Sequence, residues 1–162
     1  MAARKQYELL SPGDLAPAFR LQRLEGGEVS LSNLLPAGPI LLVFYKVSCP
    51  VCQMALPYLE RIHAASAIPI YAVSQNDAED SREFNQEYGI TMPTLLDSEE
   101  AGFPASNDYG ISHVPTTYLI GVDGKIQRVI ESWNRTELEA VASAVGVRLL
   151  QATDNVPAFR AG

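Results

Sequence analysis

The order of apolar and polar residues predicts strands that alternate with helices. Residues 40–45 form a continuous apolar run of branched and aromatic side chains, the pattern of a strand buried on both faces of a parallel sheet. Apolar residues at helical spacing follow over 50–66, and Pro57 inside that pattern predicts a kinked helix. A strand over 68–74 and a helix over 78–88 repeat the order, so we expect an α/β fold with parallel pairing of these strands.

Turn residues predict antiparallel strands on both sides of this unit. Gly26-Gly27 indicates a hairpin near the N-terminus, and Asp123-Gly124 indicates another nearer the C-terminus. The strands expected around these turns span residues 19–24, 28–31, 116–120 and 125–131. We also expect a helical turn over 32–35, a short strand over 93–96 and one helix within 97–109.

The C-terminal part is expected to hold one helix and a tail. Asn134 is placed as the N-cap of the helix, with Glu137 three residues later, and Gly146 closes it. We expect residues 151–162 to be a loosely held tail. The hydrophobic content of 47% is ample for one core, so residues 1–150 are expected to form a single domain.

The charge and hydropathy of the chain argue against a nucleic-acid partner and against a membrane span. The chain carries 12 Lys and Arg against 19 Asp and Glu, and no window concentrates basic residues, which argues against a nucleic-acid partner. The longest apolar run, residues 40–45, is far below the roughly 20 residues of a membrane span. Residues 1–5 do not lead into an apolar signal segment, so we expect a cytoplasmic location, or an exported one if a leader precedes this sequence.

The chemistry-bearing residues are the two cysteines, Cys49 and Cys52, in Cys49-Pro50-Val51-Cys52. Cys49 lies where the buried strand gives way to a helix, and Cys52 lies one turn further along. The helix N-terminus lowers the pKa of a thiol at this position, and Pro50 suits the first helical position. We therefore expect Cys49 to attack a disulfide and Cys52 to resolve the mixed disulfide, in either overall direction.

Two other interpretations of the pair remain. A closed zinc site requires four ligands, and only His63 and His113 are present as nitrogen donors, so no metal is predicted. Two inert buried thiols are the other possibility. The redox interpretation needs no bound cofactor because the two thiols hold the reducing equivalents, but it requires an electron donor or acceptor that the sequence does not identify.

Further motifs accompany the pair between about Gly13 and Gly146. They are Gly13-Asp14-Leu15-Ala16-Pro17-Ala18-Phe19, Pro57, Pro93-Thr94-Leu95-Leu96-Asp97, Tyr109-Gly110-Ile111 and Val114-Pro115-Thr116-Thr117-Tyr118-Leu119-Ile120 followed by Asp123-Gly124. With these motifs the chain resembles the thioredoxin superfamily, and within it the TlpA/ResA-type thiol-disulfide oxidoreductases of the redoxin (AhpC/TSA) group. The resemblance implies a thioredoxin fold with a central mixed sheet, flanking helices and an N-terminal β-hairpin extension, and exchange with protein or small-molecule disulfides and dithiols.

The resemblance also implies site residues beyond the cysteines. Pro115 matches the family's cis-proline, which faces the cysteine pair, and Val114 would pair through its backbone with an extended substrate segment. Two candidate modulators lie nearby in the sequence. Lys46 either stabilises the Cys49 thiolate or extends into water, and His113 either titrates beside the site or has no role there.

Departures from the family pattern keep alternatives open. Thioredoxins place a buried acid where this chain has Val43, and the ResA type places Glu where it has Ala55. The proton of Cys52 must therefore pass to water or to an unidentified group. Peroxiredoxins, the main rival class, place Pro and Thr where this chain has Leu42 and Lys46. A thiol peroxidase, a non-catalytic redox sensor or interaction module, and a dedicated reductase remain as alternative functions.

Overall fold

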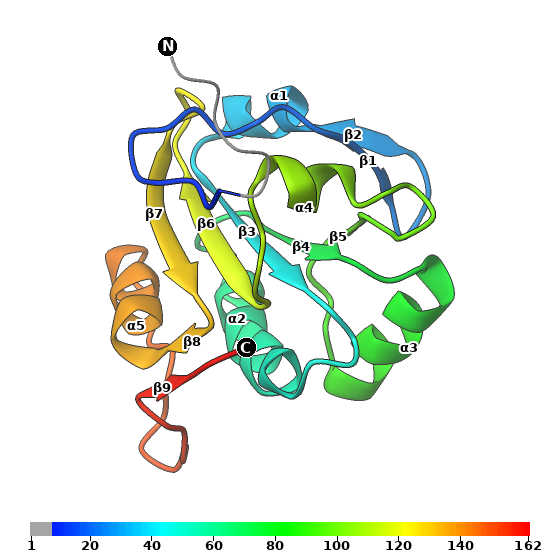
Figure 1. Cartoon of the computed structure of the whole chain (residues 1–162). Coiled ribbons are helices and arrows are strands. Elements are labelled where there is room, and N and C mark those ends of the chain that lie inside the picture. Colours follow the sequence, from blue (N-terminus) through cyan, green and yellow to red (C-terminus); the bar gives the residue numbers. More distant parts are fainter. Residues whose placement is uncertain (1–7) are drawn as a thin grey trace.

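A seven-stranded mixed sheet forms the centre of the computed structural model, which describes residues 8–162 (Figure 1). The strand order is β2-β1-β5-β4-β3-β6-β7, and a separate two-stranded sheet joins β8 to β9. Residues 1–7, which include the segment behind the predicted cytoplasmic location, lie outside the described residues. Within the described part, no helix has both the length and the apolar character needed to cross a bilayer.

The bounds of the elements agree with the predicted ones to within about two residues for most of the chain. The strands are β1 Arg20–Arg23, β2 Glu28–Ser30, β3 Ile40–Tyr45, β4 Ile70–Ser74, β5 Thr94–Leu96, β6 Thr116–Ile120, β7 Ile126–Glu131, β8 Trp133–Asn134 and β9 Phe159–Arg160. The helices are α1 Leu31–Leu34, α2 Pro50–Ala64, α3 Ala78–Tyr88, α4 Pro104–Asp108 and α5 Arg135–Ala144, with a 3-10 turn at η1 Leu35–Ala37.

Strand β3 is buried on both faces, as its continuous apolar run predicts. Its odd-numbered residues pack into one core with apolar residues of α2, α3 and α5. Its even-numbered residues pack into a second core with apolar residues of α1 and α4. Because side chains of a strand alternate between faces, this single strand supplies both cores and fixes the helices on either side of the sheet.

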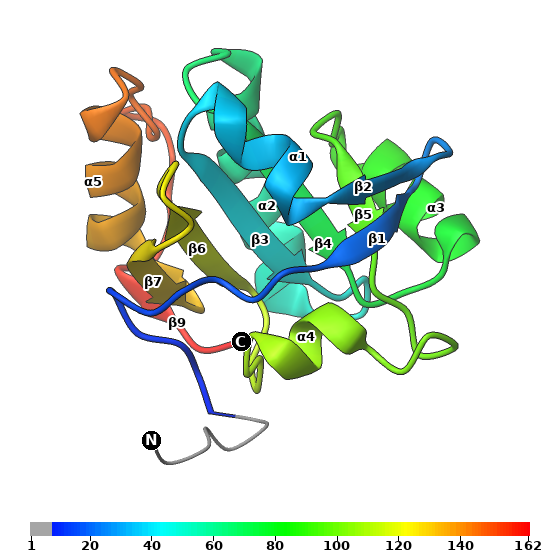
Figure 2. The ribbon, with the colours of Figure 1, turned by 90° about the horizontal axis from the view of Figure 1, so that it is seen from above.

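Parallel and antiparallel pairs combine as the sequence predicts. β3 and β5 both pair with β4 in parallel, while β6 pairs antiparallel with the other edge of β3. The β1/β2 hairpin joins the sheet through an antiparallel pairing of β1 with β5, which confirms the N-terminal hairpin extension. Figure 2 shows this strand order from above, from β7 at one edge to the hairpin at the other.

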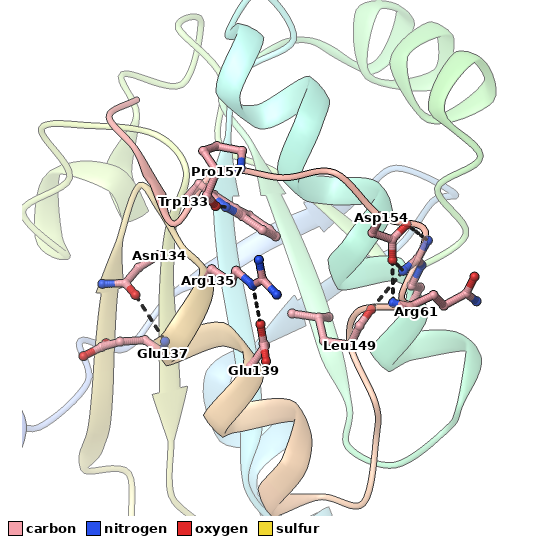
Figure 3. Close-up of polar contacts among 10 residues, drawn as sticks. Arg61, Trp133, Asn134, Arg135, Glu137, Glu139, Leu149, Asp154 and Pro157 are labelled. Carbon is pink, nitrogen blue, oxygen red and sulfur yellow. Dashed lines mark hydrogen bonds and ion pairs between the residues drawn. The ribbon is translucent and has the colours of Figure 1, made fainter.

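The C-terminal segment, residues 151–162, which we expected to be a loosely held tail, makes specific contacts with the domain. Asp154 forms a 2.6 Å ion pair with Arg61 of α2, and the indole of Trp133 donates a 2.7 Å hydrogen bond to the carbonyl of Pro157 (Figure 3). β9 then pairs with β8. The partners lie at least 24 residues away in the chain, so no local pattern could indicate these contacts.

Candidate active site

The backbone holds Cys49 at the start of α2. Cys49 is the N-cap, with extended dihedral angles of φ −87° and ψ 114°, and Pro50 occupies the first turn, where its missing N–H is no loss. The backbone N–H of Cys52 donates to the Cys49 sulfur at 3.2 Å. The loop before Cys49 is fixed as well, because Gln53 donates its side-chain amide to the carbonyl of Val47 at 3.0 Å.

A second loop closes on Cys49 from the other side. The Val114–Pro115 peptide bond is cis, as the resemblance implies for Pro115. The Cys49 thiol donates to the carbonyl of Val114 at 3.3 Å. The sheet brings these loops together, since β6 pairs antiparallel with β3 in a register that sets Thr116 opposite Phe44. The end of β3 therefore adjoins the start of β6.

The two thiols have opposite electrostatic environments. A hydrogen bond from the Cys52 thiol is the largest cause that lowers the pKa of Cys49 to about 6. Burial opposes that shift, while the backbone N–H groups of Cys52 and Val51 and the charge of Arg160 support it. Cys52 itself is fully buried, and burial raises its pKa far above the ordinary range. Near neutral pH, Cys49 is thus the thiolate and Cys52 the proton-bearing partner.

No carboxylate replaces the family's buried acid at the expected positions. Val43 and Ala55 are buried apolar residues, at 0% and 1% exposure. The aromatic hydroxyl of Tyr45 is near enough to Cys52 for the two to interact electrostatically, but burial raises the pKa of Tyr45 to about 12, and the hydroxyl donates to Asn85. Tyr45 is therefore a poor proton acceptor at neutral pH.

The candidate modulators lie at the edge of this site. Lys46 is exposed, and its backbone carbonyl accepts a hydrogen bond from the N–H of Cys49 at 3.2 Å. His113 is also exposed and shares a 2.9 Å hydrogen bond with the hydroxyl of Ser112. Neither side chain is among the groups that shift the pKa of Cys49, whereas Arg160 is. Sequence reasoning missed Arg160, which lies 111 positions after Cys49 in a segment with no redox motif.

The site brings two free thiols together. Among residues 8–162 there is no group of three or more His, Cys, Asp or Glu side chains that could hold a metal ion. Both cysteines are free thiols, with Cys49 half-buried and Cys52 buried. A lowered pKa on the accessible sulfur and a protonated sulfur one turn away are the features that thiol-disulfide exchange requires.

Comparison with known proteins agrees with this geometry. Residues 12–129 match the AhpC/TSA family. The thiol-disulfide oxidoreductase ResA of Halalkalibacterium halodurans is 32% identical to the chain over 125 residues, which are 75% of this chain and 69% of that protein. The aligned region covers most of both chains, so the similarity extends over most of the domain.

Solved structures establish the fold. The thioredoxin domain of a thiol-disulfide oxidoreductase from Bacteroides vulgatus superimposes with a TM-score of 0.73 at 24% identity, covering 83% of this chain and 97% of that one. A peroxidoxin from Mycobacterium tuberculosis superimposes at 0.65 with 23% identity, covering 83% and 93%. The shared fold alone therefore does not separate the two branches, whereas the sequence relative described above is a thiol-disulfide oxidoreductase. The chain belongs to the AhpC/TSA family and is a thiol-disulfide oxidoreductase of the thioredoxin fold.

Proposed function

We propose that Cys49 is the nucleophile and Cys52 the resolving thiol of this oxidoreductase. The Cys49 thiolate attacks one sulfur of a substrate disulfide, so a Cys49–substrate disulfide forms and the substrate's S–S bond breaks with release of a thiolate. Cys52 then loses its proton and attacks the Cys49 sulfur, which forms the Cys49–Cys52 disulfide and releases the second substrate thiolate. The substrate gains two electrons, the protein loses two, and protons end on the product thiols.

The observation that carries this proposal is the asymmetry of the two thiols. The hydrogen bond from Cys52 and the start of α2 lower the pKa of Cys49 to about 6, while burial keeps Cys52 protonated. The attacking thiolate is thus present before substrate arrives. Formation of the mixed disulfide removes the charge on Cys49, one of the causes that raise the pKa of Cys52, and so favours the second step after the first.

We propose that the substrates are disulfides of proteins, and that small-molecule disulfides react in the same way. Its support is the family membership and the half-buried Cys49 sulfur, which a disulfide can reach while Cys52 stays covered. We assign the Val114 backbone beside Cys49 to substrate contact. A separate donor or acceptor of electrons must restore the pair after each turnover, because the site holds only one pair of exchangeable electrons.

The test is the thiol-disulfide equilibrium of the pair in defined glutathione buffers, with a Cys52→Ala variant to trap the mixed disulfide. We expect a reversible two-electron transition in the native chain and a glutathione adduct on Cys49 in the variant. The midpoint potential of the pair assigns the direction of the reaction. A pair more oxidising than glutathione would introduce disulfides into its substrates, and a more reducing pair would reduce them. A pair that forms no internal disulfide would overturn the proposal.

The same experiment separates the peroxidase and sensor alternatives. Lys46 stands where peroxiredoxins have the Thr hydroxyl, and this mismatch disfavours peroxide chemistry. Rapid conversion of Cys49 to sulfenic acid by peroxide, without disulfide exchange, would favour the peroxidase. Slow exchange with every disulfide offered would favour a sensor or interaction module.

A further inference from the structure

The last residues of the described chain lie against the site. We call residues 157–162 the C-terminal strap. The N–H of Gly162 donates to the Ser132 hydroxyl at 3.0 Å, and the N–H of Ser132 donates to the carbonyl of Pro115 at 2.7 Å. A β-carbon added to Gly162 would overlap the carbonyl oxygen of Val114 and come within 3.2 Å of Cδ of Pro115. The strap therefore ends in direct contact with the Val114–Pro115 loop.

Gly162 contacts the Val114 carbonyl oxygen, which also lies next to the sulfur of Cys49. The distance from this oxygen to the Cys49 sulfur is 3.3 Å. Thiolate attack requires a disulfide sulfur to come into contact with the Cys49 sulfur. In a protein substrate, the disulfide sulfur that contacts Cys49 is followed closely by the backbone on either side of it. On the Val114 side of Cys49, the strap occupies the space that this backbone would need.

The strap is anchored at its root and lightly held at its tip. At the root, the carbonyl of Pro157 is bonded to the buried indole of Trp133, and Asp154 just before the strap is paired with Arg61 (Figure 3). Beyond the root, the carbonyl of Ala158 accepts a hydrogen bond from the N–H of Arg135 at 3.0 Å, and the tip has a two-residue pairing of β9 with β8 and the Gly162 hydrogen bond. All six strap residues are exposed. A pairing this short is marginal by itself, so the tip can lift while the root stays attached.

We propose that the C-terminal strap determines which disulfides reach Cys49, an inference that rests on the proposed function. The seated strap leaves Cys49 half-buried, and small disulfides react with it there. Protein disulfides react when the tip has lifted from the Val114–Pro115 loop. Among protein disulfides, the strap thereby selects those whose proteins bind strongly enough to displace it.

The test compares two disulfides on the same reduced chain, oxidised glutathione as the small probe and insulin as the protein probe. The readout is the ratio of the two second-order rate constants. In a chain that ends at Ala158, we expect the insulin-to-glutathione ratio to rise about tenfold, the gain for a strap seated about nine-tenths of the time. The ratio cancels any change in the Cys49 thiolate fraction caused by loss of Arg160.

A point variant tests the same contact without shortening the chain. Gly162→Ala places a methyl group against the Val114 carbonyl, so the tip must move, and we expect the ratio to rise as well. Ala152→Gly, which also changes one exposed methyl group in the C-terminal segment, should keep the native ratio.

The outcomes separate the two proposals. A native chain that exchanges with neither probe would overturn the proposed function. Exchange with glutathione at an unchanged ratio in the chain ending at Ala158, with native circular dichroism, would overturn the role of the strap and leave the function standing.

Discussion

Cys49 and Cys52 carry the same thiol group one helical turn apart, yet their surroundings move their pKa values in opposite directions. Cys49 is half-buried at the helix start, where donors from Cys52 and the backbone favour the thiolate. Cys52 points into the core, where burial favours the neutral thiol. Each thiol is also among the causes of the other's shift, so a substitution at Cys52 should change the pKa of Cys49.

The first prediction concerns the alkylation of Cys49. The rate with iodoacetamide should rise about tenfold per pH unit below a midpoint near 6 and level off above it, because only the thiolate reacts. Cys52→Ala removes the main donor to Cys49 and should move the midpoint toward that of an ordinary thiol. Cys52→Ser keeps a donor and should move it less. A native midpoint near 8.5 would contradict the lowered pKa.

The second prediction concerns Arg160, whose charge is the smallest of the causes that lower the pKa of Cys49. Arg160→Ala should raise the alkylation midpoint by less than about one unit, since an exposed charge is screened by solvent and salt. Arg160→Lys should retain the native midpoint at low salt, and 1 M salt should erase the difference between the variants. Lys46→Ala is the matched comparison, and a larger shift there would assign the effect to the candidate modulator Lys46 instead of Arg160.

At the scale of elements, Trp133 in β8 joins the C-terminal segment to the helical layer. Its indole is fully buried, packs on the ring of Tyr58 in α2 at 5.3 Å, and donates to the carbonyl of Pro157 at 2.7 Å. The bond is part-buried, so loss of the indole donor costs free energy to the extent that water does not replace it at the Pro157 carbonyl. The attachment of the segment therefore depends on this side chain.

The third prediction follows from that dependence. Trp133→Phe should lower the free energy of unfolding by about 1–3 kcal/mol, as measured by urea denaturation, because the Pro157 carbonyl loses its partner and the ring is smaller. Tyr58→Phe, which removes only a hydroxyl beside the same ring, should change it by less than about 0.5 kcal/mol. Equal effects of the two substitutions would show that the hydrogen bond contributes nothing.

At the scale of the whole molecule, the Cys49 thiolate links folding to pH. The pKa of Cys49 is about 6 in the folded state and near its ordinary value of 9 in the unfolded state, so the folded chain releases this proton first. Stability from this group is fully present above pH 9 and is lost as the pH falls through 6. Cys52, with a raised pKa, stays protonated in the folded state, and in the unfolded state it ionises only as the pH approaches the ordinary thiol value, where it lowers the slope.

The fourth prediction uses this window. The free energy of unfolding of the reduced chain, minus that of Cys49→Ser, should increase steadily between pH 6 and 8.5 in urea titrations under reducing conditions. Serine does not titrate in this range, so it removes the linkage and retains the fold. A difference that stays flat would mean that the folded and unfolded thiols have the same pKa.

Local patterns in the sequence determined the elements and the reactive pair. The apolar run of β3 predicted a strand buried on both faces, and the position of Cys49 after it predicted an N-cap thiol with Cys52 one turn on. The predictions of Asn134 as an N-cap and of the two hairpins also came from neighbouring residues, and the structure confirms them. Each of these features depends on residues within a few positions of one another, which is the range over which periodicity and capping act.

Only the tertiary structure decided what surrounds the pair. The sheet register sets Val114, 65 residues from Cys49, within 3.3 Å of its sulfur. The C-terminal residues, expected to be a loose tail, instead end against the same loop and bring the charge of Arg160 to the site. These contacts join segments that lie far apart in the chain, so residues near Cys49 in the sequence do not predict them. Spacing along the sequence therefore predicts the thiol chemistry, while the access to it depends on how the sheet and the strap assemble.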